Sequence, residues 1–186
     1  MLASRRGAGM NFWLTLIAYQ AVWFSAVIGA GQALVWPGVV ATTLFASWRL
    51  AVSVRRDVEL KLIATAFFLG LLLESAWVQG GLIRYAAPWP LPVTPAWLMA
   101  LWVAFALTIV PLFGYLHGRP MLAALLGAVG GPLAYLAAAH GWNAATLAPP
   151  TWQGVLALAA GWAIALPLLT TLARHWLRPR MPEPAA

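Results

Sequence analysis

The chain has 186 residues, of which 63% are hydrophobic and only 8% charged, and its mean hydropathy is +0.83. Soluble domains average about 25% charged residues, so this composition excludes a soluble globular protein and predicts an all-α integral membrane protein. We interpret residues 1–186 as a single transmembrane domain. The absence of cysteine excludes disulfides, cysteine-ligated metals and thiolate nucleophiles.

Six apolar stretches are each close to the roughly 20 residues that a helix needs to cross a bilayer. They predict a bundle of six transmembrane helices at residues 11–30, 33–53, 60–82, 95–116, 120–140 and 153–173. The connections suit turns: charges gather between Arg55 and Lys61, and the prolines of segment 88–92 exclude a helix there. Segment 117–120 is a predicted tight turn, and residues 174–186 form a predicted cytoplasmic tail.

Basic residues collect on one side of the six predicted helices. Of the eleven Lys and Arg residues, Arg84 alone falls on the other side. Positive residues mark the cytoplasmic side of membrane proteins with short loops, so we expect both termini to be cytoplasmic. The net charge of +7 therefore needs no nucleic-acid partner. The first apolar stretch is longer than the roughly 7–15 apolar residues of a signal peptide, so we expect it to be retained.

Small residues form a stripe along the predicted helix 120–140, with the large residues on the opposite face. At about 100° per residue the stripe contains Ala123, Ala124, Gly127, Gly131, Ala134 and Ala138. Gly127 and Gly131 are spaced as in the small-xxx-small pairs that let helix backbones approach closely. Leu126 lies on the face that we assign to lipid. Pro132 removes a backbone donor, and we expect it to bend this helix as part of the packing stripe.

Residues that carry chemistry are few. The three histidines fall at predicted helix ends, and no group of residues has metal-ligand spacing. Neither a nucleophile elbow nor a phosphate-binding loop is found in the sequence. We therefore expect no metal and no cofactor, and a role other than catalysis is favoured. Trp97 and Trp102 are interpreted as interface anchors and packing residues rather than as a binding cage.

Glu74, within GLLLESAWVQGG (residues 70–81), is the acidic residue that the composition does not explain. It lies about 20 Å along its helix from Lys61. At this depth an acidic residue costs about 2.5–3.5 kcal/mol and should face protein or a water-filled cavity. We predict an outer-facing polar pocket formed by Glu74, Gln79, Trp77, Gln32, His140, Asn143 and Arg84. The alternative is a protonated carboxyl that hydrogen-bonds across helices and only stabilises the bundle.

Four segments carry a resemblance to a known family: GLLLESAWVQGG, PAW at 95–97, LWVAFA at 101–106 and GAVGGPLAY at 127–135. Together they resemble a small bacterial inner-membrane family known as a domain of unknown function, the DUF2878 type. GAVGGPLAY is the most specific of the four, and the resemblance covers most of the chain. It implies an aspartate in most members where Glu74 stands here, and it implies no catalytic residues. It also implies a location in the bacterial inner (plasma) membrane and a role in the envelope or its lipids, because members are often encoded near lipid-modifying enzymes.

These observations favour a protein that binds or handles a lipid or another small amphiphile in the pocket around Glu74. Two alternatives stay open. One is a structural or assembly partner of a lipid-modifying membrane enzyme, without a ligand of its own. The other is a small proton-coupled carrier that uses Glu74. The expected partners are accordingly the lipid bilayer, a lipid or amphiphile ligand, and that enzyme.

Overall fold

The structure is a computed structural model that describes residues 2–89 and 94–178. The burial and contacts of side chains are described from residue 11 onward. It is built almost entirely of helices, as the composition predicts. In chain order the elements are α1 (Leu2–Gly31), α2 (Trp36–Val52), α3 (Arg56–Gln79), β1 (Ile83–Tyr85), α4 (Ala96–Ala106), α5 (Ile109–Leu112), the 3-10 helix η1 (Gly114–Leu116), α6 (Pro120–Trp142), β2 (Ala145–Leu147) and α7 (Thr151–Leu177).

Four helices of the described chain are long and apolar enough to cross a membrane. They are α3, α6, α7 and the part of α1 from Asn11 to Gly31. The second helix is shorter than predicted: α2 has 17 residues, whereas the prediction covered residues 33–53. The charged segment predicted as a turn is mostly helical, because α3 already begins at Arg56. The predicted tail begins inside α7, and residues 179–186 lie outside the described part, as do residues 90–93 of the proline-rich connection.

The prediction of one continuous helix over residues 95–116 is wrong. The chain forms α4 of 11 residues, then the single turn α5, then η1. Two residues explain the interruption. The Thr108 hydroxyl donates a 2.6 Å hydrogen bond to the Phe105 carbonyl, which competes with the helical backbone bonds. Pro111 has no backbone N–H to continue the helix.

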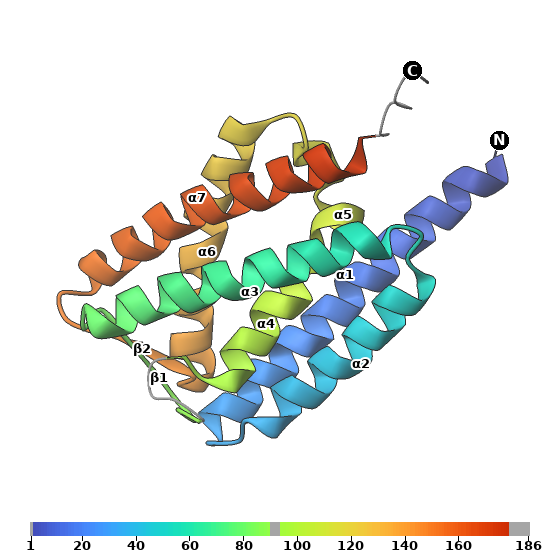
Figure 1. Cartoon of the computed structure of the whole chain (residues 1–186). Coiled ribbons are helices and arrows are strands. Elements are labelled where there is room, and N and C mark those ends of the chain that lie inside the picture. Colours follow the sequence, from blue (N-terminus) through green and yellow to red (C-terminus); the bar gives the residue numbers. More distant parts are fainter. Residues whose placement is uncertain (1, 90–93, 179–186) are drawn as a thin grey trace, which may run out of the picture.

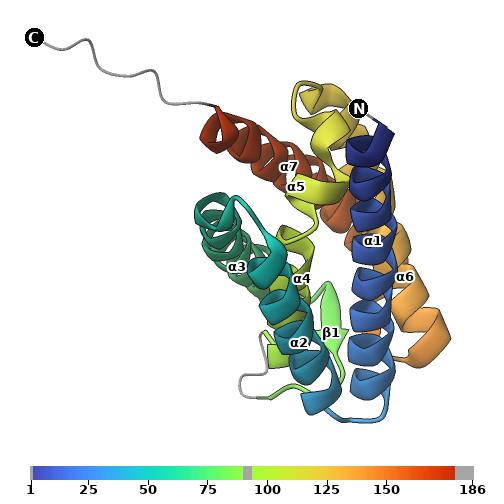
Figure 2. The same ribbon diagram turned by 90° about the vertical axis from the view of Figure 1, so that its right-hand side faces the viewer.

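The long helices run back and forth, so that α1 starts and α7 ends at the same end of the bundle (Figure 1). The turn between α2 and α3 lies at this end too, and the two strands lie at the opposite end (Figures 1 and 2). The strands pair antiparallel, with Arg84 opposite Thr146 and Tyr85 opposite Ala145. The sequence did not predict this strand pair, which brings the chain after α3 against the chain after α6.

The glycines of the predicted stripe on α6 face α7. A Cβ atom on Gly127 would lie 2.1 Å from the carbonyl oxygen of Trp162, and one on Gly131 would lie 2.3 Å from the Trp162 ring. Both distances are far below ordinary contact, so only glycine permits this approach of the two helices. Pro132 is buried within α6, and Leu126 on another face is 39% exposed.

Large apolar side chains cover much of the outer surface of the helices. Among those that are more than half exposed are Trp13, Ile17, Leu44, Phe68, Leu72, Leu125, Leu133 and Ile164. Soluble monomers rarely expose apolar patches of this extent. The surface is suited to hydrocarbon, in agreement with a membrane protein.

Two basic residues stabilise the end of the bundle at which α1 starts and α7 ends. Arg49 of α2 forms a buried ion pair with Glu59 of α3, with 2.8 Å between Nη2 and Oε1. Arg55, in the turn between these helices, donates hydrogen bonds to the carbonyls of Trp176 (2.9 Å) and Leu177 (3.3 Å). These bonds satisfy carbonyls at the C-terminus of α7 that have no partner within the helix.

Candidate functional site

Glu74 lies near the C-terminal end of α3, the end that leads into β1, and is fully buried. It is five residues before the helix ends at Gln79, a rise of about 7.5 Å. Gly70, one turn earlier on the same face, allows α4 to come close, because a Cβ there would lie 2.5 Å from the Trp102 ring. The glycine thus makes room for the tryptophan that reaches the carboxyl group.

Three neutral donors from three other elements bind this carboxyl group. Trp102 of α4 donates from Nε1 to Glu74 Oε1 over 2.9 Å. The Tyr135 hydroxyl of α6 donates to the same oxygen, and the Tyr85 hydroxyl of β1 donates to Oε2. One side chain therefore ties together four elements that lie far apart in the sequence.

Local structure positions these donors. In β1 the residues alternate, so Ile83 and Tyr85 are buried while Arg84 is exposed. Just after this strand, Trp97 donates a 3.0 Å hydrogen bond to the Ala86 carbonyl, which fixes the chain that carries Tyr85. Burial, with Glu74 nearby, raises the pKa of Tyr85 well above its usual value. The Tyr85 hydroxyl therefore stays protonated and can donate a hydrogen bond to Glu74.

No positive side chain among the described residues forms an ion pair with Glu74. This differs from Glu59, whose partner is Arg49. All hydrogen bonds to Glu74 come from uncharged groups, which satisfy a buried polar group without bringing a second charge out of water.

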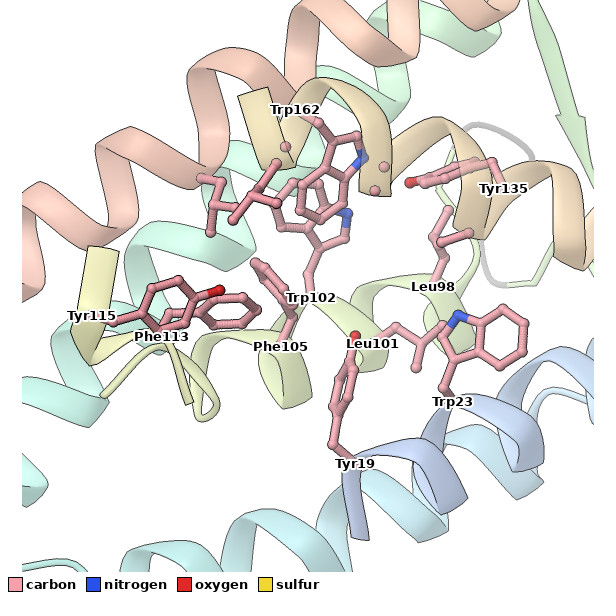
Figure 3. A pocket seen from close by; sticks show the side chains of 16 residues that line it. Tyr19, Trp23, Leu98, Leu101, Trp102, Phe105, Phe113, Tyr115, Tyr135 and Trp162 are labelled. Carbon is pink, nitrogen blue, oxygen red and sulfur yellow. The ribbon is translucent and has the colours of Figure 1, made fainter. Parts of the chain in front are cut away.

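A cavity of about 340 Å³ adjoins the donors of Glu74. Aromatic side chains form much of its wall (Figure 3), and Trp102 and Tyr135 belong to both the cavity wall and the carboxyl site. The rings of Trp102 and Trp162 are stacked, with centroids 4.7 Å apart and planes 9° apart. The lining residues are Tyr19, Trp23, Leu98, Leu101, Trp102, Phe105, Phe113, Tyr115, Leu126, Gly127, Gly130, Gly131, Ala134, Tyr135, Trp162 and Leu166.

The cavity carries no charged side chain among its lining residues. Its polar groups are tyrosine hydroxyls and indole N–H groups. Two lining residues, Tyr115 and Leu126, are 54% and 39% exposed, so the cavity reaches the surface beside η1 and α6. It can therefore accept an uncharged, largely apolar molecule.

The structure brings one of the predicted pocket residues close to the site. Trp77 is buried, and its ring meets the Tyr135 ring edge to face, with centroids 6.0 Å apart. Gly161 of α7 makes room for it, since a Cβ there would lie 2.5 Å from the Trp77 ring. Trp77 thus supports the tyrosine that binds Glu74.

The other predicted pocket residues are not brought to Glu74. Gln32, Gln79, Arg84, His140 and Asn143 are all exposed, and none of them donates to the carboxyl group or lines the cavity. Asn143 instead ends α6 in a left-handed conformation, in which its N–H bonds to the Ala139 carbonyl at 3.1 Å. The carboxyl group is thus enclosed by aromatic residues and not by the polar residues that the sequence suggested.

Sequence reasoning missed the three residues that bind Glu74. Trp102, interpreted from the sequence as an interface anchor and packing residue, is only 2% exposed and does pack inside the bundle, but its N–H also binds the carboxyl group. The signal in the sequence that could have found them is that a buried carboxyl group needs hydrogen-bond donors. The chain has only four tyrosines, and two of them, Tyr85 and Tyr135, meet that requirement.

A family model described as a protein of unknown function (DUF2878) matches residues 12–168. This range includes Glu74, its three donors and every residue that lines the cavity. No curated protein and no solved structure matches the chain.

Proposed function

Because the chain belongs to the DUF2878 family, which is described by no activity, we propose a function from the site itself: the protein binds a lipid or another small amphiphile in the aromatic cavity beside Glu74. The observation that carries this proposal is the position of the cavity. It has an apolar aromatic wall, its rim at Tyr115 and Leu126 is exposed, and one end meets the hydrogen-bonded groups around Glu74.

The size and chemistry of the cavity support a ligand of this kind. Pockets for small molecules measure about 300–1,000 Å³ and combine an apolar lining with a few placed polar groups. The cavity of about 340 Å³ lies at the lower end of this range, which suits one chain or one ring system rather than a whole phospholipid. Its rim lies beside helices with exposed apolar surfaces, so a ligand would reach it from the bilayer.

We test this proposal by filling the cavity. Gly130 is an exposed lining residue, and nothing lies within 4 Å of a Cβ built there, so a leucine there should take up space at the cavity without a clash against the fold. Gly141→Leu is the matched control, because it lies on the same helix, has equal space and is not a lining residue. Each variant is purified in mild detergent, and its retained lipids are identified by mass spectrometry.

The expected result is a specific lipid that the wild type and Gly141→Leu retain and Gly130→Leu loses. Equal retention by all three, or no lipid beyond bulk membrane lipid in the wild type, would reject the proposal. A carrier role is a second candidate, favoured by the buried Glu74, which forms no ion pair with a basic residue in the described part of the chain. Proton flux into vesicles that depends on Glu74 would support it.

For the topology we propose six crossings, with both termini on the cytoplasmic side of the bacterial inner membrane. In addition to the four long helices, α2 and the segment from α4 to η1 would cross as shorter elements. The asymmetry of basic residues supports this orientation. Reporters fused after Arg178 and in the turn at Ser53 should read cytoplasmic, and those at Trp89 and Pro149 should read external. Opposite readings at Arg178 and Ser53 would overturn the topology.

A further inference from the structure

The hydrogen bonds at Glu74 determine what Tyr135 can offer to a ligand. A tyrosine hydroxyl has one hydrogen to donate and two lone pairs that accept, whereas an indole N–H only donates. The hydrogen of Tyr135 and that of Trp102 Nε1 are both used on Glu74 Oε1. Towards the cavity, Tyr135 therefore presents an acceptor.

A free donor lies at the same end of the cavity. Trp162 Nε1 is buried and lies near the Tyr135 hydroxyl, but it forms no hydrogen bond of ordinary length and angle with any described residue. Figure 3 shows the Tyr135 hydroxyl pointing toward the nitrogen-bearing edges of Trp162 and Trp102. An acceptor and a donor thus lie together in an otherwise apolar wall.

A hydroxyl group is complementary to this pair, since it donates one hydrogen and accepts another. We propose that the cavity selects an uncharged lipid alcohol, whose hydroxyl donates to Tyr135 and accepts from Trp162. This inference rests on the proposed function and adds the chemical class of the ligand. A carboxylate or phosphate is disfavoured, because no lining residue carries a positive charge to offset its burial.

The test uses three bromine-terminated probes of equal chain length: an alcohol, a methyl ketone and an alkyl bromide. Bromine quenches tryptophan fluorescence, and Trp102 and Trp162 lie in the cavity wall. Binding is measured on purified protein in detergent, with Gly130→Leu giving the quenching that does not depend on the cavity. The ketone can accept from Trp162 but has no hydrogen for Tyr135.

With each hydrogen bond changing affinity by about fivefold, the alcohol should bind more tightly than the ketone, and the ketone more tightly than the alkyl bromide. Tyr135→Phe should remove the difference between alcohol and ketone. Trp162→Phe should remove the difference between ketone and alkyl bromide, so the inference stays testable if one variant fails to fold.

The alcohol preference and the proposed function can be refuted separately. If the three probes bind the wild type equally well and Gly130→Leu weakens all of them, the alcohol preference is wrong and the proposed function stands. If no probe binds in a manner that Gly130→Leu weakens, the proposed function itself is rejected.

Discussion

Replacing Gly127 by alanine should separate α6 from α7. The new Cβ would lie 2.1 Å from the carbonyl oxygen of Trp162, and ordinary contact begins at 3.4 Å. The helices would have to move apart by about 1.3 Å at this point. Because the obstacle is a backbone atom, no rotation of a side chain can relieve the clash.

The cost of this separation can be estimated. Overpacking a tight contact destabilises by about 1–3 kcal/mol, and the backbone obstacle places Gly127→Ala near the upper end. Gly130→Ala is the matched control, one turn away on the same helix with nothing within 4 Å of its Cβ. Alanine is a better helix former than glycine by up to about 1 kcal/mol, so this control should be neutral or slightly stabilising.

The assay is unfolding in mixed micelles with a rising fraction of SDS, followed by far-UV circular dichroism. We expect the free energy of unfolding of Gly127→Ala to fall about 3 kcal/mol below that of Gly130→Ala. If the two variants unfold within about 0.5 kcal/mol of each other, α6 does not pack on α7 through this glycine.

Two further predictions concern the end of the bundle that holds both termini. Arg49→Met should destabilise by about 3–5 kcal/mol, because it leaves the Glu59 carboxylate buried without its partner; Arg49→Met with Glu59→Met should recover most of this in the same unfolding assay. Burial, together with Arg174, lowers the pKa of His117 from its usual 6.5. The folded protein thus favours the neutral ring, while the unfolded chain takes up a proton more readily. The free energy of unfolding should therefore fall as the pH drops below about 6.5. His117→Gln should flatten this dependence, and an unchanged pH profile would contradict it.

The sequence predicted the class and the packing stripe because both depend on local pattern. Hydropathy over about 20 residues marks spans, and the four-residue spacing of Gly127 and Gly131 marks a helix contact. The break in residues 95–116 escaped prediction, because the stretch is apolar enough to read as one span and the hydrogen bond of Thr108 leaves no trace in hydropathy; Pro111 was its one local signal. Depth along the helix indicated that Glu74 is buried.

The partners of Glu74 could not be predicted in the same way. They come from β1, α4 and α6, and sequence gives no measure of which residues of distant elements meet. The predicted pocket was assembled by depth alone, which selected polar residues such as Gln79 and His140 that the structure leaves exposed. Depth is one coordinate, and the direction in which a side chain points depends on packing that involves the whole bundle.

Trp102 also determines which amide orientation Glu74→Gln can adopt. An indole N–H only donates, so the amide oxygen must occupy the place of Oε1, where Trp102 and Tyr135 donate to it. The amide nitrogen then faces Tyr85, whose oxygen can accept. Tyr85 then accepts a hydrogen bond instead of donating one, so only its own hydrogen loses an acceptor, and Glu74→Gln should unfold within about 1 kcal/mol of the wild type.

Glu74→Leu replaces the carboxyl group by an apolar side chain and leaves the same three donors without their acceptor. Each unsatisfied buried group costs about 1–3 kcal/mol, which outweighs the about 2.5–3.5 kcal/mol saved by removing an acid from the membrane if all three stay unpaired. Adding Tyr85→Phe and Tyr135→Phe to Glu74→Leu removes two of the three donors and should restore stability. A Glu74→Leu protein more stable than Glu74→Gln in the mixed-micelle assay would refute this reasoning, since the carboxyl group would then contribute nothing to holding the four elements together.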